Sequence, residues 1–110
     1  MENILAAINN TCANQGYVIQ YSNAQGAVNT DWKNFPGILV GERIRLNIVF
    51  SETEIKIREI YNYQGSTGWQ DSNAEPMYSA RGAREKFANE LRELLGPQAT
   101  VEAVKQPINN

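Results

Sequence analysis

The sequence predicts an α+β fold in the order α-β-β-β-β-α, in which a short antiparallel sheet carries two helices packed on one face. Two segments, near residues 3–14 and 80–95, repeat apolar residues at the spacing of an amphipathic helix. Between them, residues 41–63 alternate apolar and polar side chains with the period of two that half-buried strands show. The 110 residues suit one domain with a single core. We place this single α+β domain at residues 1–105 and a polar C-terminal tail at residues 106–110.

The first helix is expected over residues 3–14, and Gly16 follows it where a left-handed residue ends many helices. Residues 17–21 are rich in aromatic and β-branched side chains, which favours a strand. After a turn at residues 23–26, alternating apolar and polar residues predict a second strand. The residues expected on its core face are Val28, Thr30 and Trp32.

The clearest pattern is the hairpin over residues 41–63. If residues 51–52 form a two-residue loop, Ile48 pairs with Ile55, and the isoleucines of both strands share one face. The same register brings Arg45 opposite Arg58.

This register also places Glu59 on the core face and points Ile60 outward. We therefore expect a β-bulge near residues 58–59 that returns Ile60 to the core. Residues 62–79 read as a long irregular stretch, a kind of segment that is usually functional or mobile.

The second helix is expected to begin at Ser79 as its N-cap and to stop at Gly96-Pro97. Residues 100–104 are compatible with one further short strand. The apolar stripe of this helix consists of Ala80, Ala83, Phe87, Ala88, Leu91, Leu94 and Leu95.

Composition excludes several classes of function. The net charge of −2 gives no overall attraction to nucleic acid, so a nucleic-acid partner is not expected. There is no histidine, which removes the usual general base and the commonest zinc ligand, and the single cysteine, Cys12, is expected in the core. No calcium-loop or phosphate-loop motif is present, and no apolar run is long enough to span a membrane. We therefore expect no enzyme, no cofactor and no metal.

The leading functional hypothesis is a non-enzymatic binding module that contacts a protein partner. Its first candidate surface is the polar face of the hairpin. Like charges directly opposite each other destabilise a sheet unless a negative charge, from the protein or from a bound partner, lies between them. The alternative is an ordinary solvated sheet face. The candidate residues on this face are Arg43, Arg45, Lys56 and Arg58.

The second candidate surface is the irregular stretch, whose Trp69, Met77 and Tyr78 are suited to anchor a partner. The alternative is that Trp69 folds back over the edge of the core.

A second functional hypothesis is a small-ligand carrier with a pocket between helix and sheet. Its lining residues would be Tyr17, Tyr21, Trp32 and Tyr61. For Trp32 the alternation with Val28 favours packing in the core over ligand contact.

Residues 16–19, GYVI, and residues 26–32, GAVNTDW, resemble small α+β envelope domains of Gram-negative lipoproteins. These domains combine a helix, a G-Y-x-[VI] strand, a strand ending in T-x-W, and a hairpin closed by a C-terminal helix. The similarity covers roughly residues 3–63 and implies an α+β fold with a binding or assembly role rather than catalysis. The binding-module hypothesis includes an envelope-associated protein and a small phage-type protein alike. The chain departs from the pattern because it has no lipidation cysteine at its start. We expect a periplasmic or envelope location if a leader was removed and a cytoplasmic one otherwise.

Overall fold

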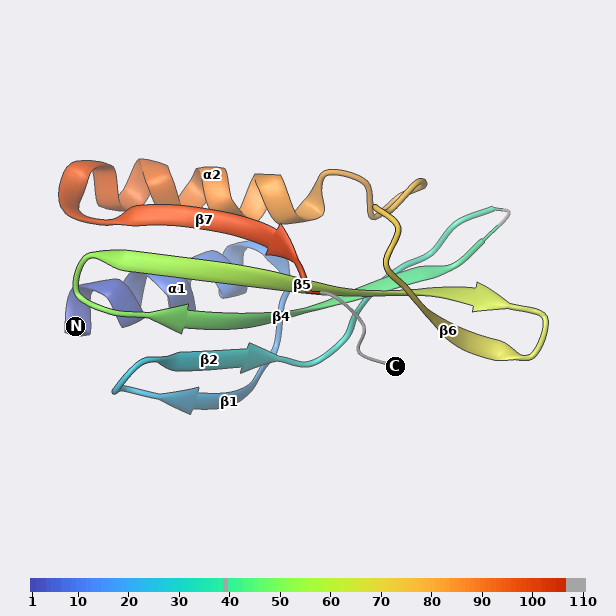
Figure 1. The fold of residues 1–110 in the computed structure, drawn as a ribbon, viewed down its shortest axis with the longest axis horizontal. Helices are drawn as coiled ribbons and strands as arrows, with labels where there is room; N and C mark the ends of the chain where they lie inside the picture. The colour runs from blue at the N-terminus through green and yellow to red at the C-terminus, as the bar shows by residue number, and fades with distance from the viewer. Residues whose placement is uncertain (39, 107–110) are drawn as a thin grey trace.

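The computed structural model describes residues 1–38 and 40–106. Within them the chain is α+β, with two α-helices on one side of a seven-stranded mixed sheet (Figure 1). The predicted α+β class is therefore confirmed, but the sheet has seven strands where four were expected, and it is mixed where an antiparallel sheet was expected, because β7 pairs parallel with β5. The elements are α1 (Glu2–Gln15), β1 (Ile19–Asn23), β2 (Ala27–Thr30), β3 (Lys33–Phe35), β4 (Glu42–Phe50), β5 (Glu54–Gly65), β6 (Gly68–Ser72), α2 (Ala83–Leu95), the 3-10 helix η1 (Gly96–Gln98) and β7 (Thr100–Lys105).

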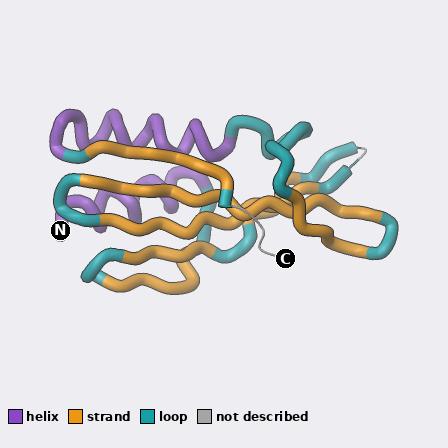
Figure 2. Tube along the Cα trace, in the orientation of Figure 1, coloured by secondary structure: helices purple, strands orange, loops and turns teal. Residues whose placement is uncertain are grey.

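The β4–β5 hairpin lies at the centre of the sheet. Strands β1 and β2 extend it on one side in the order β1-β2-β4-β5, and β7 runs parallel to the first half of β5. Strand β3 pairs with the first half of β4, and β6 pairs with the last half of β5. These two short strands lie at the end of the sheet that projects beyond the helices, where Figure 2 shows only strands and loops.

The hairpin register differs from the expected one by two residues. Phe50 pairs with Ile55 and Ile48 with Ile57, without interruption as far as Glu42 and Tyr63. The loop is longer than two residues because the Ser51 hydroxyl accepts hydrogen bonds from two backbone N–H groups across it.

A shift of two keeps every side chain on its predicted face, so the isoleucines still face the core. The predicted bulge at residues 58–59 is absent from this pairing, and that prediction was wrong. Glu59 stays on the core face, where it is 1% exposed, and Ile60 points away from the core.

One core joins the apolar stripes of both helices to the inner face of the sheet. Tyr17, just after α1, packs edge-on against Phe87 of α2 with 5.5 Å between the ring centroids. Gly16 ends α1 with φ of 79°, as the sequence predicts. The largest fully buried apolar side chains are Ile4, Ile8, Ile44, Leu46, Ile48, Ile55, Ile57, Phe87 and Leu91.

The start of the second helix was mispredicted. Helix α2 begins at Ala83, with Gly82 at its N-cap in the left-handed conformation. Ser79 does not cap the helix, because its hydroxyl donates instead to the backbone carbonyls of Phe35 and Pro36.

Half of the stretch at residues 62–79, expected to be irregular, is ordered as strands. It contains the end of β5 and all of β6, and only residues 73–82 connect β6 to α2. The predicted short strand at residues 100–104 is present as β7. Of the predicted tail, residues 107–110 lie outside the described residues.

Buried Glu42 holds the connecting segment against the sheet. Its carboxylate accepts hydrogen bonds from the backbone N–H groups of Met77 and Ala80, at 3.2 and 2.9 Å, and from that of Tyr78. It also accepts from the Tyr61 hydroxyl, and burial together with this bond raises the pKa of Tyr61. A carboxylate that accepts several donors at once is stable when buried, so Glu42 fixes the path of residues 77–80.

Candidate functional site

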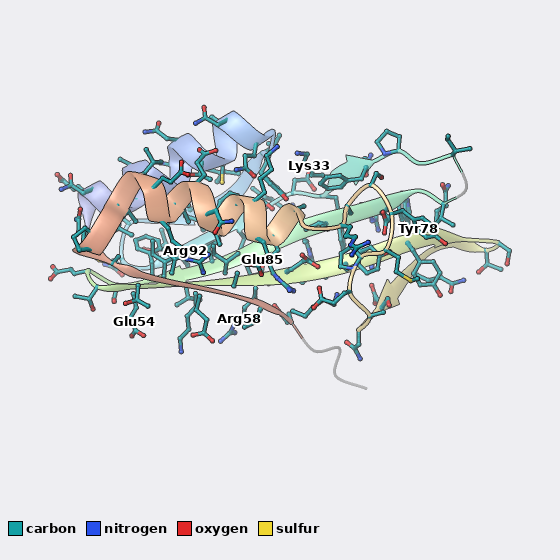
Figure 3. The ribbon with its side chains drawn as sticks, turned by 90° about the horizontal axis from the view of Figure 1, so that it is seen from above. Lys33, Glu54, Arg58, Tyr78, Glu85 and Arg92 are labelled. Carbon is teal, nitrogen blue, oxygen red and sulfur yellow. The ribbon has the colours of Figure 1, made fainter. Side chains whose placement is uncertain are left out.

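The sheet face turned away from the helices, here called the open face, is the most distinctive surface of the molecule. Both helices lie on the opposite face, and Glu54 and Arg58 point away from them (Figure 3). No helix in the described part of the chain covers it. Because side chains alternate along strands, the register assigns it Tyr21, Asn29, Trp32, Arg43, Arg45, Asn47, Val49, Glu54, Lys56, Arg58, Ile60, Asn62, Trp69, Asp71, Glu102 and Val104.

Four of these side chains form a continuous stack, here called the Arg–Trp stack: Arg45, Trp32, Arg43 and Trp69. The Arg43 guanidinium carbon lies 4.2 Å from the centroid of the Trp32 ring and 4.4 Å from that of Trp69. The Arg45 guanidinium carbon lies 4.9 Å from the same Trp32 ring. Each contact is within cation–π range, so the two cations are held by the indoles in fixed positions.

Trp32 reaches this stack through a change of register along β4. Val28 of β2 pairs with Ile48, whereas Lys33 of β3 pairs with Ile44, so one extra residue lies between the two strands. A slip of one residue reverses the faces of all side chains beyond it. The prediction that Trp32 packs in the core beside Val28 was therefore wrong; Trp32 is half-buried on the open face.

Arg43 is anchored at a second point. Its Nε donates to Asn62 Oδ1 at 3.0 Å, and the Asn62 amide in turn donates to the Asp71 carboxylate and to a backbone carbonyl. Burial, and then the neighbouring charge of Arg45, lower the pKa of Arg43 from its ordinary value, while Asp71 and Asp31 oppose that shift. This polar support could not be predicted from the sequence, because Asn62 and Asp71 come from β5 and β6, in a stretch expected to be irregular.

In the part of the chain that the structure describes, no cation of the open face lies within 4.0 Å of a carboxylate oxygen. Among the described residues, the ion pairs within 4.0 Å join Arg84 to Glu75 and to Glu85, on the helix side. Lys56 and Arg58 are exposed, and the Nε of Arg45 is buried without a hydrogen-bond partner.

The expected pairing of Arg45 with Arg58 is wrong. In the observed register, Arg45 lies opposite Ile60 and Arg58 lies opposite Asn47. The shift of two residues therefore moves Arg58 from directly opposite Arg45 to a diagonal position, while Arg43 and Arg45 stay close enough for the charge of Arg45 to lower the pKa of Arg43.

The open face also exposes large apolar side chains. Tyr21 is 51% exposed and Trp69 is 38% exposed, and Val49 and Val104 are exposed as well. Trp69 does not fold back over the core edge, as the alternative reading had it, because its ring lies against Arg43. Cationic and aromatic side chains on one uncovered sheet face are a composition that protein interfaces favour.

The other two predicted anchors lie on the opposite side. Met77 and Tyr78, held by Glu42, contribute to a mostly apolar hollow of about 330 Å³ on the helix side of the projecting hairpin. Its remaining lining residues are Val40, Tyr61, Tyr63, Ser72, Ala74 and Glu75. The predicted partner-binding residues thus divide between two faces.

The four residues predicted to line a ligand pocket do not come together. Tyr17 is buried against Phe87, and Tyr61 is buried beside Glu42. Tyr21 and Trp32 lie on the open face, on the other side of the sheet. Of the four, Tyr61 alone borders the apolar hollow.

No group of three or more Cys, Asp or Glu side chains in the described residues is placed to hold a metal ion. Cys12 is buried, and this burial raises the pKa of its thiol to about 11. No helix of the described residues is long and apolar enough to cross a membrane.

No protein-family model, curated protein or solved structure matches this chain.

Proposed function

We propose that this chain is a non-enzymatic binding domain whose open face docks onto a protein partner that presents acidic side chains. The observation that carries the proposal is the Arg–Trp stack. Two guanidinium groups are held in place by two indoles, and none of the described carboxylates lies within 4.0 Å of them. The exposed Lys56 and Arg58 extend the positive charge along β5.

The stack is suited to binding because its arginine side chains are already ordered in the free protein, so they lose little conformational entropy when a partner binds. A free arginine loses side-chain entropy when it is fixed in an interface, typically about 0.5–1.5 kcal/mol. Arg43 is already held between two rings and by a hydrogen bond from its Nε to Asn62, which leaves its two terminal guanidinium nitrogens as further donors for a partner. Carboxylates match this geometry, since the planar fork of arginine binds them in a bidentate manner.

The test compares two double variants, each of which replaces two basic residues with glutamate and so changes the net charge by the same amount. Lys56→Glu/Arg58→Glu changes exposed residues outside the stack, so the fold is retained. Arg81→Glu/Lys86→Glu changes exposed residues on the helix side and serves as the control. Proteins retained from native lysate by the wild type are identified, purified, and titrated against all three forms by calorimetry.

We expect the partner to bind the wild type and the control alike and to lose at least about tenfold in affinity for the open-face variant, with a strong dependence on salt. Equal binding by both variants would show that the open face is merely solvated. Retention of nucleic acid in place of a protein would overturn the assignment of partner class.

We also propose, as a second function, that the apolar hollow takes a small aromatic ligand. Its support is a volume of about 330 Å³ bordered by three tyrosines and Met77. Titration with p-cresol, read by NMR at the Met77 methyl group, should give a saturable shift that Ala74→Leu abolishes by filling the hollow. Shifts that never saturate, or that Ala74→Leu leaves unchanged, would refute it.

The resemblance to lipoprotein envelope domains agrees with a binding role for the chain, and an envelope location remains part of the proposal. Fractionation of cells of the source organism with an antibody against the domain would test it. Recovery in the cytosolic fraction alone would remove the envelope assignment without affecting the binding proposal.

A further inference from the structure

The N-terminal part of the chain builds a surface without charge. Residues 3–30 contain no Asp, Glu, Lys or Arg, although charged residues make up 20% of the whole sequence. This segment forms most of α1 and all of β1 and β2. The exposed positions of α1 beyond Glu2 are Asn3, Ala6, Asn9, Asn10, Ala13 and Asn14.

The two helices therefore differ in a way that burial does not explain. The exposed side of α2 carries Glu85, Lys86, Arg92 and Glu93, which is ordinary for a solvated helix. Protein interfaces are depleted of charged side chains at their centres, whereas free surfaces are rich in them.

Strand β1 lies at the edge of the sheet and pairs, among the described residues, only with β2. An edge strand exposes unpaired backbone N–H and C=O groups, and proteins protect such edges with charged residues, proline, β-bulges or very short strands. The other outer strands follow this rule, since β3 contains Lys33, β6 contains Asp71, and β7 contains Glu102 and Lys105.

Strand β1, with the sequence IQYSN, has no charge and no proline, and Val18 just before it is 68% exposed. An irregularity in the pairing with β2 falls between Ile19 and Tyr21, yet residues 19–23 remain a single strand. Apart from this irregularity, the β1 edge has none of the charged or proline residues that the other outer strands carry.

We propose that the β1 edge pairs antiparallel with the β1 edge of a second copy of this chain, which joins the two sheets into one. In a two-fold dimer the same strand of each copy meets its counterpart, so the β1 edge must be compatible with itself. If the axis passes near Tyr21, the two tyrosines lie opposite each other, and Gln20 faces Ser22 of the partner. A neutral edge brings no like charges together in this arrangement, although the whole chain is negative.

The pairing would also place two open faces side by side, because Tyr21 belongs to that face. The dimer does not depend on the proposed partner binding, and its test needs no partner.

The experiment measures molecular mass by sedimentation equilibrium from the micromolar range to about 0.5 mM, since dimer formation follows mass action. Wild type should shift from one chain to two. Gln20→Lys/Ser22→Lys, which sets lysines opposite each other across the axis, should stay monomeric. Ser66→Lys/Thr67→Lys adds the same charge to the exposed β5–β6 turn and should dimerise like wild type.

Cross-linking locates the contact independently. Tyr21→Cys should form a covalent dimer under mild oxidation, because residues facing each other across strands lie within disulfide reach. Tyr78→Cys, exposed on the helix side, should not. Wild type that remains monomeric throughout, a Gln20→Lys/Ser22→Lys variant that still dimerises, or equal cross-linking of the two cysteine variants would each overturn the proposal.

Discussion

Glu59 should make the stability of the domain depend on pH in a way that a single substitution removes. This carboxyl group is 1% exposed on the core face of β5, and its Oε1 has no hydrogen-bond partner among residues 1–38 and 40–106. Burial raises its pKa from 4.5 to about 7, while Arg84 of α2 and Lys105 of β7 oppose the shift and Glu75 and Glu85 add to it.

The sign of the effect follows from where the proton is held. Between about pH 4.5 and about pH 7 the folded chain keeps a proton on Glu59 that the unfolded chain releases, so the free energy of unfolding falls as pH rises. A shift from 4.5 to about 7 corresponds to about 3 kcal/mol at about 1.4 kcal/mol per unit. This stabilisation is complete below the unfolded pKa and is lost as pH rises through the folded pKa.

Glu59→Gln has the shape of the protonated carboxyl group and cannot ionise. We expect its free energy of unfolding to match that of wild type near pH 4.5 and to exceed it by about 2–3 kcal/mol near pH 8.5. Urea unfolding followed by tryptophan fluorescence measures both, and taking the difference between the proteins cancels the titration of every other group.

Glu93→Gln, on the exposed side of α2, is the matched control and should leave the pH profile unchanged. A difference between wild type and Glu59→Gln that is the same at both pH values would refute the reasoning. It would mean that Arg84 and Lys105 fully compensate the buried charge.

Three further substitutions test the packing. Trp32→Ala should cost about 1–2 kcal/mol by removing two cation–π contacts, and it should weaken partner binding; urea unfolding and calorimetry measure the two effects. Glu42→Ala should cost about 3–5 kcal/mol and speed amide exchange in the segment before α2, because it leaves several buried donors without an acceptor. Gly26→Ala should lower stability by about 1–3 kcal/mol in the same assay, since its φ is 147° and a Cβ atom would lie 2.8 Å from the Phe50 carbonyl oxygen. Unchanged unfolding or exchange in any of these variants would contradict the contact assigned to it.

Alternation predicted the core of the hairpin correctly but not its pairing. The positions of Ile48, Ile55 and Ile57 determine which face is buried, and that face is the same for two registers that differ by two residues. What selects between them is the loop, where the Ser51 side chain binds two backbone N–H groups. Such a local contact has no periodic signal in the sequence.

The β-bulge predicted near Glu59 is absent for a physical reason. Strict alternation places this acid on the core face, which is unfavourable for an unpaired carboxylate and therefore predicts a bulge. The structure accepts the acid instead, since α2 and β7 bring Arg84 and Lys105 near it. Both partners come from elements that follow β5 by many residues, so their proximity could not be read from the hairpin alone.

The candidate site shows the same limit. Arg43, Arg45 and Trp69 were predicted as parts of two separate surfaces, yet they lie within one stack. They are joined there by Trp32, which one extra residue between β2 and β3 turns from the core to the open face. If that residue were deleted, strict alternation would continue and Trp32 would point into the core. The stack would then lose the ring that joins its two arginines, so the geometry proposed to bind an acidic partner depends on this local break in the pattern that builds the rest of the sheet.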